Sequence, residues 1–142
     1  MTIARLIASH SDEIFSCDIA TSVRDAVTML ATKRIGALPV MDKGAIAGIF
    51  SERDAVRQLA EYGPSFLDKN VGEVMTAPAI TVEPTTPVMD ALGLMTRRRF
   101  RHLPVVENGR MTGFVSIGDL VKYRIEGIVA EAEAMRNYIQ SA

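Results

Sequence analysis

The sequence predicts a mixed α/β fold of the α+β type, in which two β-α-β-β-α units pack sheet to sheet with pseudo-twofold symmetry. Three observations predict it. The chain repeats itself, because the segment from Thr21 aligns with the segment from Thr86, 65 positions later. Both copies show helical and strand periodicities in the same order. A unit of roughly sixty residues buries little surface by itself, so two copies are expected to pack together.

The repeat needs no gap from Thr21 to Val56. Most pairs that are not identical keep their apolar character, which composition alone would not produce. The clearest identities pair Leu38-Pro39-Val40 with Leu103-Pro104-Val105, Gly44 with Gly109, Gly48 with Gly113, Ser51 with Ser116, and Asp54 with Asp119.

The local patterns predict the same elements in each copy. Apolar residues at helical spacing begin at Val23 and at Val88. Two strands follow each helix, over 37–41 and 46–50 and over 102–106 and 111–115, with a hairpin turn at 42–44 and at 107–109. A strand before the first helix is expected over 13–17 and over 79–82, and a last helix begins near Ser51 and near Ser116. Short helical turns open the copies, over 3–8 and over 71–76, in a register slipped by three residues.

Proline and loop signals refine this plan. Pro39 and Pro104 cannot donate a ladder hydrogen bond, so their strands should lie where that donor is not required. We expect a first unit at residues 1–62, a linker at 63–70 that opens with a loop, a second unit at 71–126 and a C-terminal helix extension at 127–142. That helix carries an apolar stripe, which fits packing on its own unit and a dimer seam equally well.

Composition narrows the function. Of the 142 residues, 48% are apolar, as in a soluble globular protein, and the net charge of −1 gives no general attraction to nucleic acid or to membranes. The single cysteine, Cys17, excludes an internal disulfide and is expected to be a buried small hydrophobe. The N-terminus lacks a signal-peptide pattern and no apolar run reaches the ~20 residues of a membrane span, so we expect a cytoplasmic protein.

The strongest local feature is Gly-x-x-Ser-x-x-Asp, which occurs at Gly48–Asp54 and again at Gly113–Asp119. One interpretation is a capping box at a helix start. The other is a ligand site, in which the helix N-terminus and the hydroxyls of Ser51 and Ser116 bind phosphate while Asp54 and Asp119 bind a ribose diol. Repetition in the same register favours ligand binding, and the preceding glycine would permit close approach of backbone or ligand.

Further site residues come from the basic run at 97–102. Arg97 and Arg98 fit a solvated helix end, whereas Arg101 and His102 begin a strand and could face phosphates, as could Arg53 and Gly118 beside the serines. Gly36 and Ala37 hold the corresponding positions in the first copy and leave room for a planar base. Apolar walls of the base pocket are expected from Ile14, Phe15, Ile49, Ile80 and Phe114.

Catalysis finds little support in the sequence. There are two histidines, and His10 lies in a polar N-terminal stretch. No nucleophile–His–Asp arrangement, metal-ligand cluster or Walker-type loop is present, so we expect neither an enzyme nor a metal requirement. With no Trp and 6% aromatic residues, an RNA-binding face is also not indicated.

At these motifs the chain resembles the CBS-domain family, named after the regulatory segment of cystathionine β-synthase. The resemblance covers nearly the whole chain as one tandem pair, or Bateman module, of the bacterial stand-alone type, and the second copy matches better. It implies AMP, ADP, ATP, NAD(H) or S-adenosylmethionine as ligand, ribose binding by Asp54 and Asp119, and a homodimer of two pairs. A nucleotide sensor acting on an unknown regulated protein is therefore expected, with a dimerisation scaffold bearing vestigial sites as the alternative.

Overall fold

The computed structural model describes residues 1–9 and 13–141. His10 and the last residue of the expected C-terminal extension lie outside this range. The elements of the first half are α1 (Ile3–Ser9), β1 (Cys17–Asp18), α2 (Val23–Lys33), β2 (Ala37–Asp42), β3 (Ala45–Ser51), α3 (Glu52–Tyr62), the 3-10 helix η1 (Gly63–Asp68) and α4 (Val71–Val74). The second half holds α5 (Val88–Arg98), β4 (His102–Glu107), β5 (Arg110–Ser116) and α6 (Ile117–Ser141).

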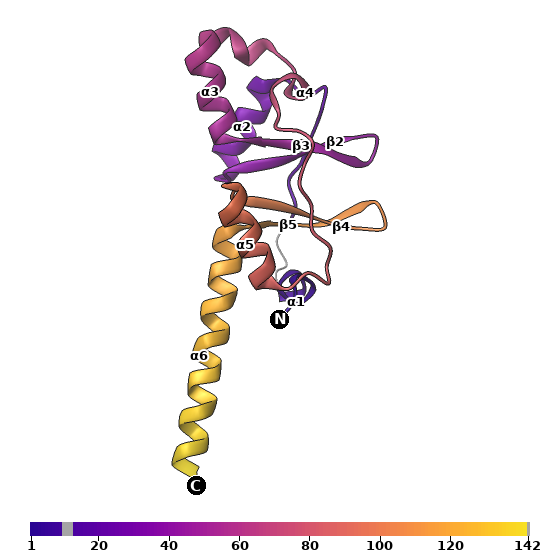
Figure 1. Ribbon diagram of the computed structural model, residues 1–142. Helices are drawn as coiled ribbons and strands as arrows, with labels where there is room; N and C mark the ends of the chain where they lie inside the picture. Colours follow the sequence, from indigo (N-terminus) through magenta and orange to yellow (C-terminus); the bar gives the residue numbers. More distant parts are fainter. Residues whose placement is uncertain (10–12, 142) are drawn as a thin grey trace.

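The expected mixed α/β fold is confirmed (Figure 1). The β2–β3 and β4–β5 hairpins lie side by side at the centre, and β3 contacts β5. Helices α2 and α3 lie on one side of this pair and α1, α5 and α6 on the other, while the far end of α6 extends away from the body. The helices and hairpin strands fall where the periodicity placed them.

Both hairpins turn at the expected residues. The backbone angle φ is positive at Lys43 and Gly44 in the first turn and at Asn108 and Gly109 in the second. Two successive positive φ angles belong to the tight turn that matches the twist of the flanking strands, and they favour the Asn-Gly pair found here.

The first strand of each unit is much shorter than the sequence suggested. Strand β1 pairs in parallel with β2 through Cys17 and Val40, and in the second unit only the equivalent bridge between Val82 and Val105 remains. The predicted strands over 13–17 and 79–82 are therefore wrong over most of their length. Residues in both stretches line cavities instead of pairing in a sheet.

The prolines lie at positions where no ladder donor is needed, as expected. Pro39 is opposite Ile49, and Ile49 makes both of its backbone hydrogen bonds with Thr76, on the other side, at 2.9 Å each. Pro104 is opposite Phe114 in the same register.

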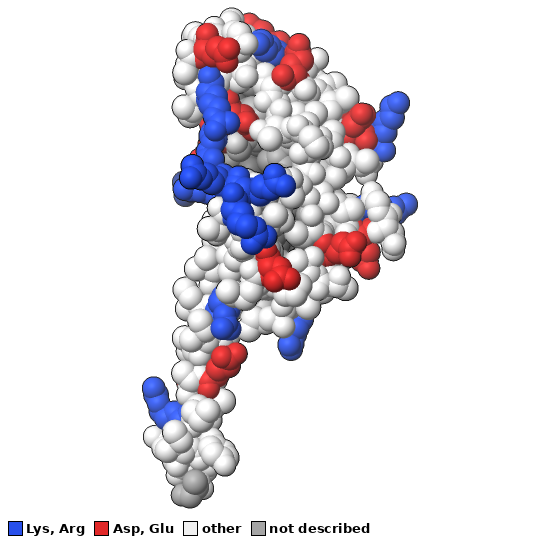
Figure 2. Space-filling view, in the orientation of Figure 1, with Lys and Arg blue, Asp and Glu red and all other residues white. Residues whose placement is uncertain are grey.

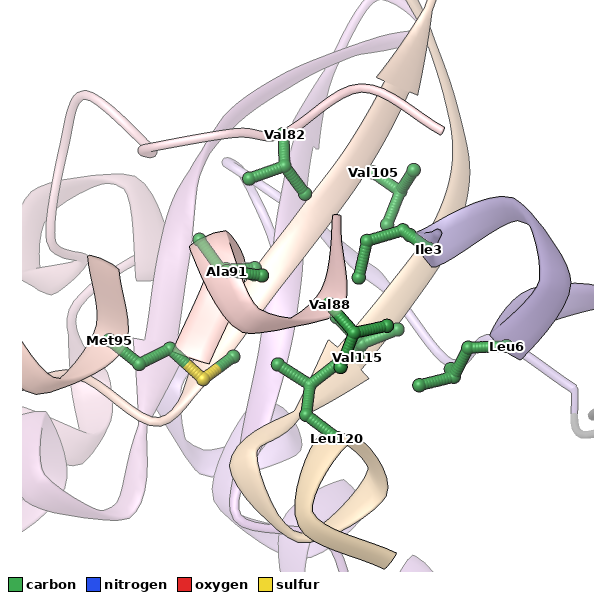
Figure 3. Packing of buried hydrophobic residues seen from close by; sticks show 10 residues of the cluster. Ile3, Leu6, Val82, Val88, Ala91, Met95, Val105, Val115 and Leu120 are labelled. Carbon is green, nitrogen blue, oxygen red and sulfur yellow. The ribbon is translucent and has the colours of Figure 1, made fainter. Parts of the chain in front are cut away.

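Each unit has its own hydrophobic core, but the short opening helices cross over. Ile3 and Leu6 of α1 are fully buried in the core of the second unit, together with Val88, Val105 and Leu120 (Figure 3). In the same way, Val71 and Val74 of α4 belong to the core of the first unit. The two units are thus tied together by exchanged helices, so neither core is complete without a segment from the other half of the chain.

The glycine that occurs in both copies of the repeat, as Gly48 and Gly113, reflects this crossing. A Cβ on Gly48 would lie 2.6 Å from the carbonyl oxygen of Thr76, and one on Gly113 would lie 2.7 Å from Cδ1 of Ile7. Such distances are shorter than van der Waals contact allows. The sequence predicts that this glycine permits close approach of backbone or of ligand. In the structure it permits close approach of another segment of the same chain.

The expected linker is ordered and packed. The loop predicted from Tyr62 to Ser65 is wrong, because η1 continues directly from α3 and buries Phe66 in the core of the first unit. Gly63 and Pro64 end the α-helix α3 and begin the 3-10 helix η1. The boundaries of the two units stay a prediction.

Helix α6 resolves part of the ambiguity of its apolar stripe. Leu120 is buried in the second core, whereas Ile125 is 55% exposed and Ile139 67% exposed. The stripe beyond the first turns therefore does not pack on its own unit.

Cys17 is buried, as expected, and its thiol lies 3.9 Å from the carbonyl oxygen of Pro39. Burial, together with the neighbouring charge of Asp18, raises the pKa of the thiol to about 11. A thiol that stays protonated is a poor nucleophile, so Cys17 acts as a core residue.

Candidate functional site

Two cavities of similar size lie where the units meet. The Asp119 cleft has a volume of about 620 Å³ and the Asp54 cleft one of about 650 Å³, both within the range of small-molecule pockets. Gly36 and His102 line both clefts, so the two cavities adjoin at these residues.

Each cleft takes its walls from both units. Ser116 and Asp119 of the second unit share a cleft with residues 34–37 of the first. Ser51 and Asp54 of the first unit share the other with residues 98–102 of the second. The two copies differ at Gly36-Ala37 and Arg101-His102. Each of these segments lines the cleft that holds the aspartate of the opposite copy, so a change in one copy alters the cleft of the other.

The structure brings nearly all the predicted site residues to these two clefts. The Asp119 cleft holds Ile14, Phe15, Gly36, Ala37, His102, Phe114, Ser116 and Asp119. The Asp54 cleft holds Gly36, Ile49, Ser51, Arg53, Asp54, Ile80, Arg101 and His102. Gly118 is exposed and is not among the residues that line either cleft.

Several lining residues were not predicted. Arg57, Arg98 and Arg99 line the Asp54 cleft, whereas the sequence predicts a solvated helix end for Arg98. The sequence does contain a signal for Arg57, which follows Arg53 by one helical turn and so lies on the same face of α3. Nothing in the sequence shows that the end of α5 faces this helix.

Ser51 and Asp54 form a complete capping box at the start of α3. The backbone N–H of Ser51 donates to Oδ2 of Asp54 at 2.9 Å, and the N–H of Asp54 donates to Oγ of Ser51 at 3.3 Å. The hydroxyl of Thr76 donates to the other carboxylate oxygen, Oδ1, at 2.9 Å. Asp54 is only 8% exposed, so its carboxylate is largely used within the protein.

Asp119 makes the same cap but keeps more of its carboxylate open. The N–H of Ser116 donates to Oδ2 of Asp119 at 2.8 Å, and the N–H of Asp119 donates to Oγ of Ser116 at 3.1 Å. In the slipped register of the opening helices, the counterpart of Thr76 is Ala8, which has no hydroxyl. Asp119 is also half-buried where Asp54 is buried. The capping and ligand-binding interpretations are therefore compatible at Asp119.

The helix starts are partly satisfied by the protein. The first N–H of α3, at Glu52, donates to the carbonyl of Gly36 at 3.0 Å, and that of α6, at Ile117, donates to the carbonyl of Arg101 at 2.8 Å. The serine N–H is bonded to the aspartate and the aspartate N–H to the serine hydroxyl, so three of the four orphan donors of each helix are used. The bonds of Glu52 and Ile117 also join each helix start to the strand start of its own unit.

The apolar walls differ between the clefts. The Asp119 cleft has Phe15 and Phe114, and the ring of His102 stacks on Phe114 with 5.6 Å between centroids and 12° between planes. The repeat equivalents of these phenylalanines in the Asp54 cleft are Ile80 and Ile49. An aromatic face suits a planar base better than an aliphatic one.

The charges differ even more. The Asp54 cleft carries five arginines against Glu52 and Asp54, a formal charge of +3. The Asp119 cleft carries Arg34 against Glu13 and Asp119, a formal charge of −1 with His102 neutral. Figure 2 shows basic side chains gathered on one face at the level where the two units meet.

The charge state of His102 follows from its position. Burial lowers the pKa of His102 below its ordinary value of 6.5, and Arg101 adds to this, while Asp119 and Glu52 partly oppose it. The imidazole is therefore neutral at neutral pH. A neutral imidazole carries one N–H, so it can donate one hydrogen bond to a phosphate oxygen.

Comparison with known proteins identifies the fold as a tandem pair of one kind of domain. The family model for the CBS domain matches twice, at residues 6–61 and 71–126. This chain belongs to the CBS-domain family.

Similar proteins are known at the level of sequence and structure. A mitochondrial CBS domain-containing protein of Arabidopsis thaliana, CBSX3, is 40% identical over 87% of this chain, which spans 63% of that protein's length. A CBS-domain protein from Burkholderia ambifaria superposes with a TM-score of 0.83 at 40% identity, covering 89% of this chain and 95% of that one. The structure of CBSX2 in complex with AMP has a TM-score of 0.74 at 27% identity, covering 88% of this chain and 96% of that one.

Across residues 1–9 and 13–141, no group of three or more His, Cys, Asp and Glu side chains is placed to hold a metal ion. Within the same ranges, no helix combines the length and the apolar character that crossing a bilayer requires.

Proposed function

We propose that this protein is a regulatory, non-catalytic module that binds adenine nucleotides, AMP, ADP, ATP or NAD(H), in its two clefts and signals to a partner protein. The observation that carries the proposal is the duplicated Ser-x-x-Asp helix start, which faces a ligand-sized cavity in each half. The AMP complex of the similar protein CBSX2 supports an adenosine-containing ligand. Cys17, kept as a reduced core thiol, fits a cytoplasmic location.

The Asp119 cleft offers the parts that an adenosine moiety needs. Oδ1 of Asp119 can accept hydrogen bonds from the ribose diol, Phe15 and Phe114 provide aromatic walls for the base, and the Ser116 hydroxyl lies at the helix start where phosphate is favoured. Because the walls come from both units, a bound ligand would favour one relative arrangement of the units over others. That change is the signal that a partner protein would read.

The test of this proposal is the substitution Asp119→Ala. It should weaken the binding of the nucleotide held in the Asp119 cleft at least tenfold, since it removes the open carboxylate from that cleft. Isothermal titration calorimetry with AMP, ATP and NADH measures the effect and identifies the ligand. Asp90→Ala is the matched control, because Asp90 also lies in the first turn of a helix but lines neither cleft. Unchanged affinity of Asp119→Ala for every nucleotide that the wild type binds would contradict the proposal.

A homodimer is part of the proposed function. Large apolar side chains along α6, among them Ile125, Ile128 and Ile139, are about half or more exposed, which is costly unless another surface covers them. We place a second copy of the chain there. A scaffold without ligand function would also form this dimer but would bind no nucleotide, so light scattering together with the calorimetry separates the two functions.

A further inference from the structure

We propose that the two clefts bind different classes of ligand, which rests on the proposed nucleotide function. The Asp54 cleft takes the polyphosphate chain of a nucleoside di- or triphosphate and recognises it mainly by charge. The Asp119 cleft takes an adenosine compound with at most one phosphate and recognises it by its ribose and base.

The basic residues of the Asp54 cleft come from two elements that face each other. Arg53 and Arg57 lie on α3, whereas Arg98, Arg99 and Arg101 lie at the end of α5 and the start of β4. Among the described residues, the two ion pairs are Arg24–Asp68 and Arg124–Glu131, and neither involves this group. Guanidinium groups without carboxylate partners are available to bind phosphate oxygens.

One of these arginines also makes a hydrogen bond between the two elements. Nη1 of Arg53 donates to the carbonyl oxygen of Arg99 at 3.0 Å, across the interface between the units. Arg99 is the left-handed residue that ends α5, so this bond joins the start of α3 to the end of α5. The arginines of both elements line the same cleft.

Like charges held together repel one another, and this repulsion is relieved by an anionic ligand. A formal charge of +3 can be balanced by a triphosphate but only partly by a monophosphate. In the Asp119 cleft, with a formal charge of −1, each further phosphate is repelled by Glu13 and Asp119. The number of phosphates therefore affects affinity in opposite directions in the two clefts.

The capacity to bind ribose also differs between the clefts, and it is greater at Asp119 than at Asp54. A carboxylate has about four lone-pair positions for hydrogen bonds. Asp54 uses three of them, for the N–H of Ser51, for the hydroxyl of Ser51 and for Thr76. Asp119 uses one, for the N–H of Ser116. The ribose diol thus finds two free acceptor positions on Oδ1 of Asp119 and a nearly saturated carboxylate at Asp54.

The walls follow the same division. Phenylalanines at positions 15 and 114 line the Asp119 cleft, and isoleucines stand at the equivalent positions 49 and 80 of the Asp54 cleft. Phe100 does line the Asp54 cleft, but it also packs against the core of the second unit. A base is therefore held more strongly in the Asp119 cleft, and phosphates more strongly in the other.

The experiment uses calorimetric titration with adenosine, AMP, ATP and inorganic tripolyphosphate, without added divalent cations. The double variant Arg57→Gln/Arg101→Gln should lose at least tenfold in affinity for ATP and tripolyphosphate, while its affinity for adenosine and AMP changes less than twofold. Asp119→Ala should lose adenosine and AMP but still bind tripolyphosphate like the wild type. The matched control is Arg110→Gln/Arg136→Gln, which removes the same charge from residues that line neither cleft.

The outcomes separate this proposal from the proposed function. If no adenine nucleotide binds the wild type, the proposed function fails, whatever tripolyphosphate does. If nucleotides bind but adenosine and ATP displace each other from one cleft, the division of ligands is overturned. The same holds if tripolyphosphate does not bind, or if the Arg57→Gln/Arg101→Gln variant weakens AMP and ATP equally. Thermal unfolding of each variant confirms that binding is measured on folded protein.

Discussion

The Asp54 and Asp119 clefts have the same helix start, nearly the same volume and the same position in the repeat, and yet they offer different chemistry. The Asp54 cleft is basic, with aliphatic residues at the repeat-equivalent wall positions and a nearly saturated carboxylate. The Asp119 cleft is slightly acidic, with aromatic walls and an open carboxylate. Because each cleft combines one copy's helix start with the other copy's strand start, a few substitutions in one copy change the cleft of the other. Duplication followed by such exchange produces two unlike sites from one motif.

The largest difference between the units is expected at the glycines before the serines. Gly48→Ala should lower the free energy of unfolding by about 3 kcal/mol and Gly113→Ala by about 1 kcal/mol. The added Cβ on Gly48 meets a backbone oxygen that is fixed by hydrogen bonds to Ile49, whereas the one on Gly113 meets the flexible end of Ile7. Urea unfolding measures the loss of unfolding free energy in both variants, and each variant is the control for the other. Equal losses would mean that the crossing segments are packed alike in both units.

A smaller difference is expected at Thr76. Thr76→Val should cost about 2 kcal/mol of unfolding free energy, because it removes a hydrogen bond to a buried carboxylate. Thr112→Val is the control, since Thr112 lies in the Asp119 cleft and its hydroxyl makes only a long contact of 3.5 Å. Chemical denaturation distinguishes them. A cost for Thr76→Val no greater than that for Thr112→Val would show that Asp54 is not held in the way described.

The smallest effect concerns pH and His102. Since the pKa of His102 is lower in the folded protein than in the unfolded chain, the unfolded state binds the extra proton first as pH falls. The stability contributed by the neutral imidazole is therefore present above about pH 6.5 and is lost as pH falls from there toward the folded pKa. His102→Gln should flatten this part of the stability–pH profile. Thermal unfolding between about pH 5 and 8, the range in which histidine ordinarily titrates, measures the change. A profile that keeps its full slope in the variant would remove His102 from this role.

Much of the fold was predictable because the repeat fixes local structure twice. Helices α2 and α5, both hairpins and the helix starts at Ser51 and Ser116 follow from periodicity and turn chemistry alone. The first strands were overestimated, since an apolar stretch that lines a cavity has the same composition as one that pairs in a sheet. The 3-10 helix η1 within the expected linker was not predicted, because Phe66, which anchors it, gains its burial from tertiary packing.

For the site, the sequence predicted the residues better than their grouping. Of the fifteen predicted site residues, fourteen line a cleft and Gly118 does not. The exchange between units could not be predicted from spacing, because it depends on which strand start faces which helix start. For the same reason Arg98 and Arg99 were missed, although their basic character was evident.

The most direct test of the account is the structure of the protein crystallised with AMP and, separately, with ATP. We predict that AMP lies in the Asp119 cleft, with its ribose on Asp119, and that the triphosphate of ATP lies among Arg53, Arg57 and Arg101 in the Asp54 cleft. A triphosphate bound in the Asp119 cleft, with the arginines of the other cleft free of ligand, would contradict the account.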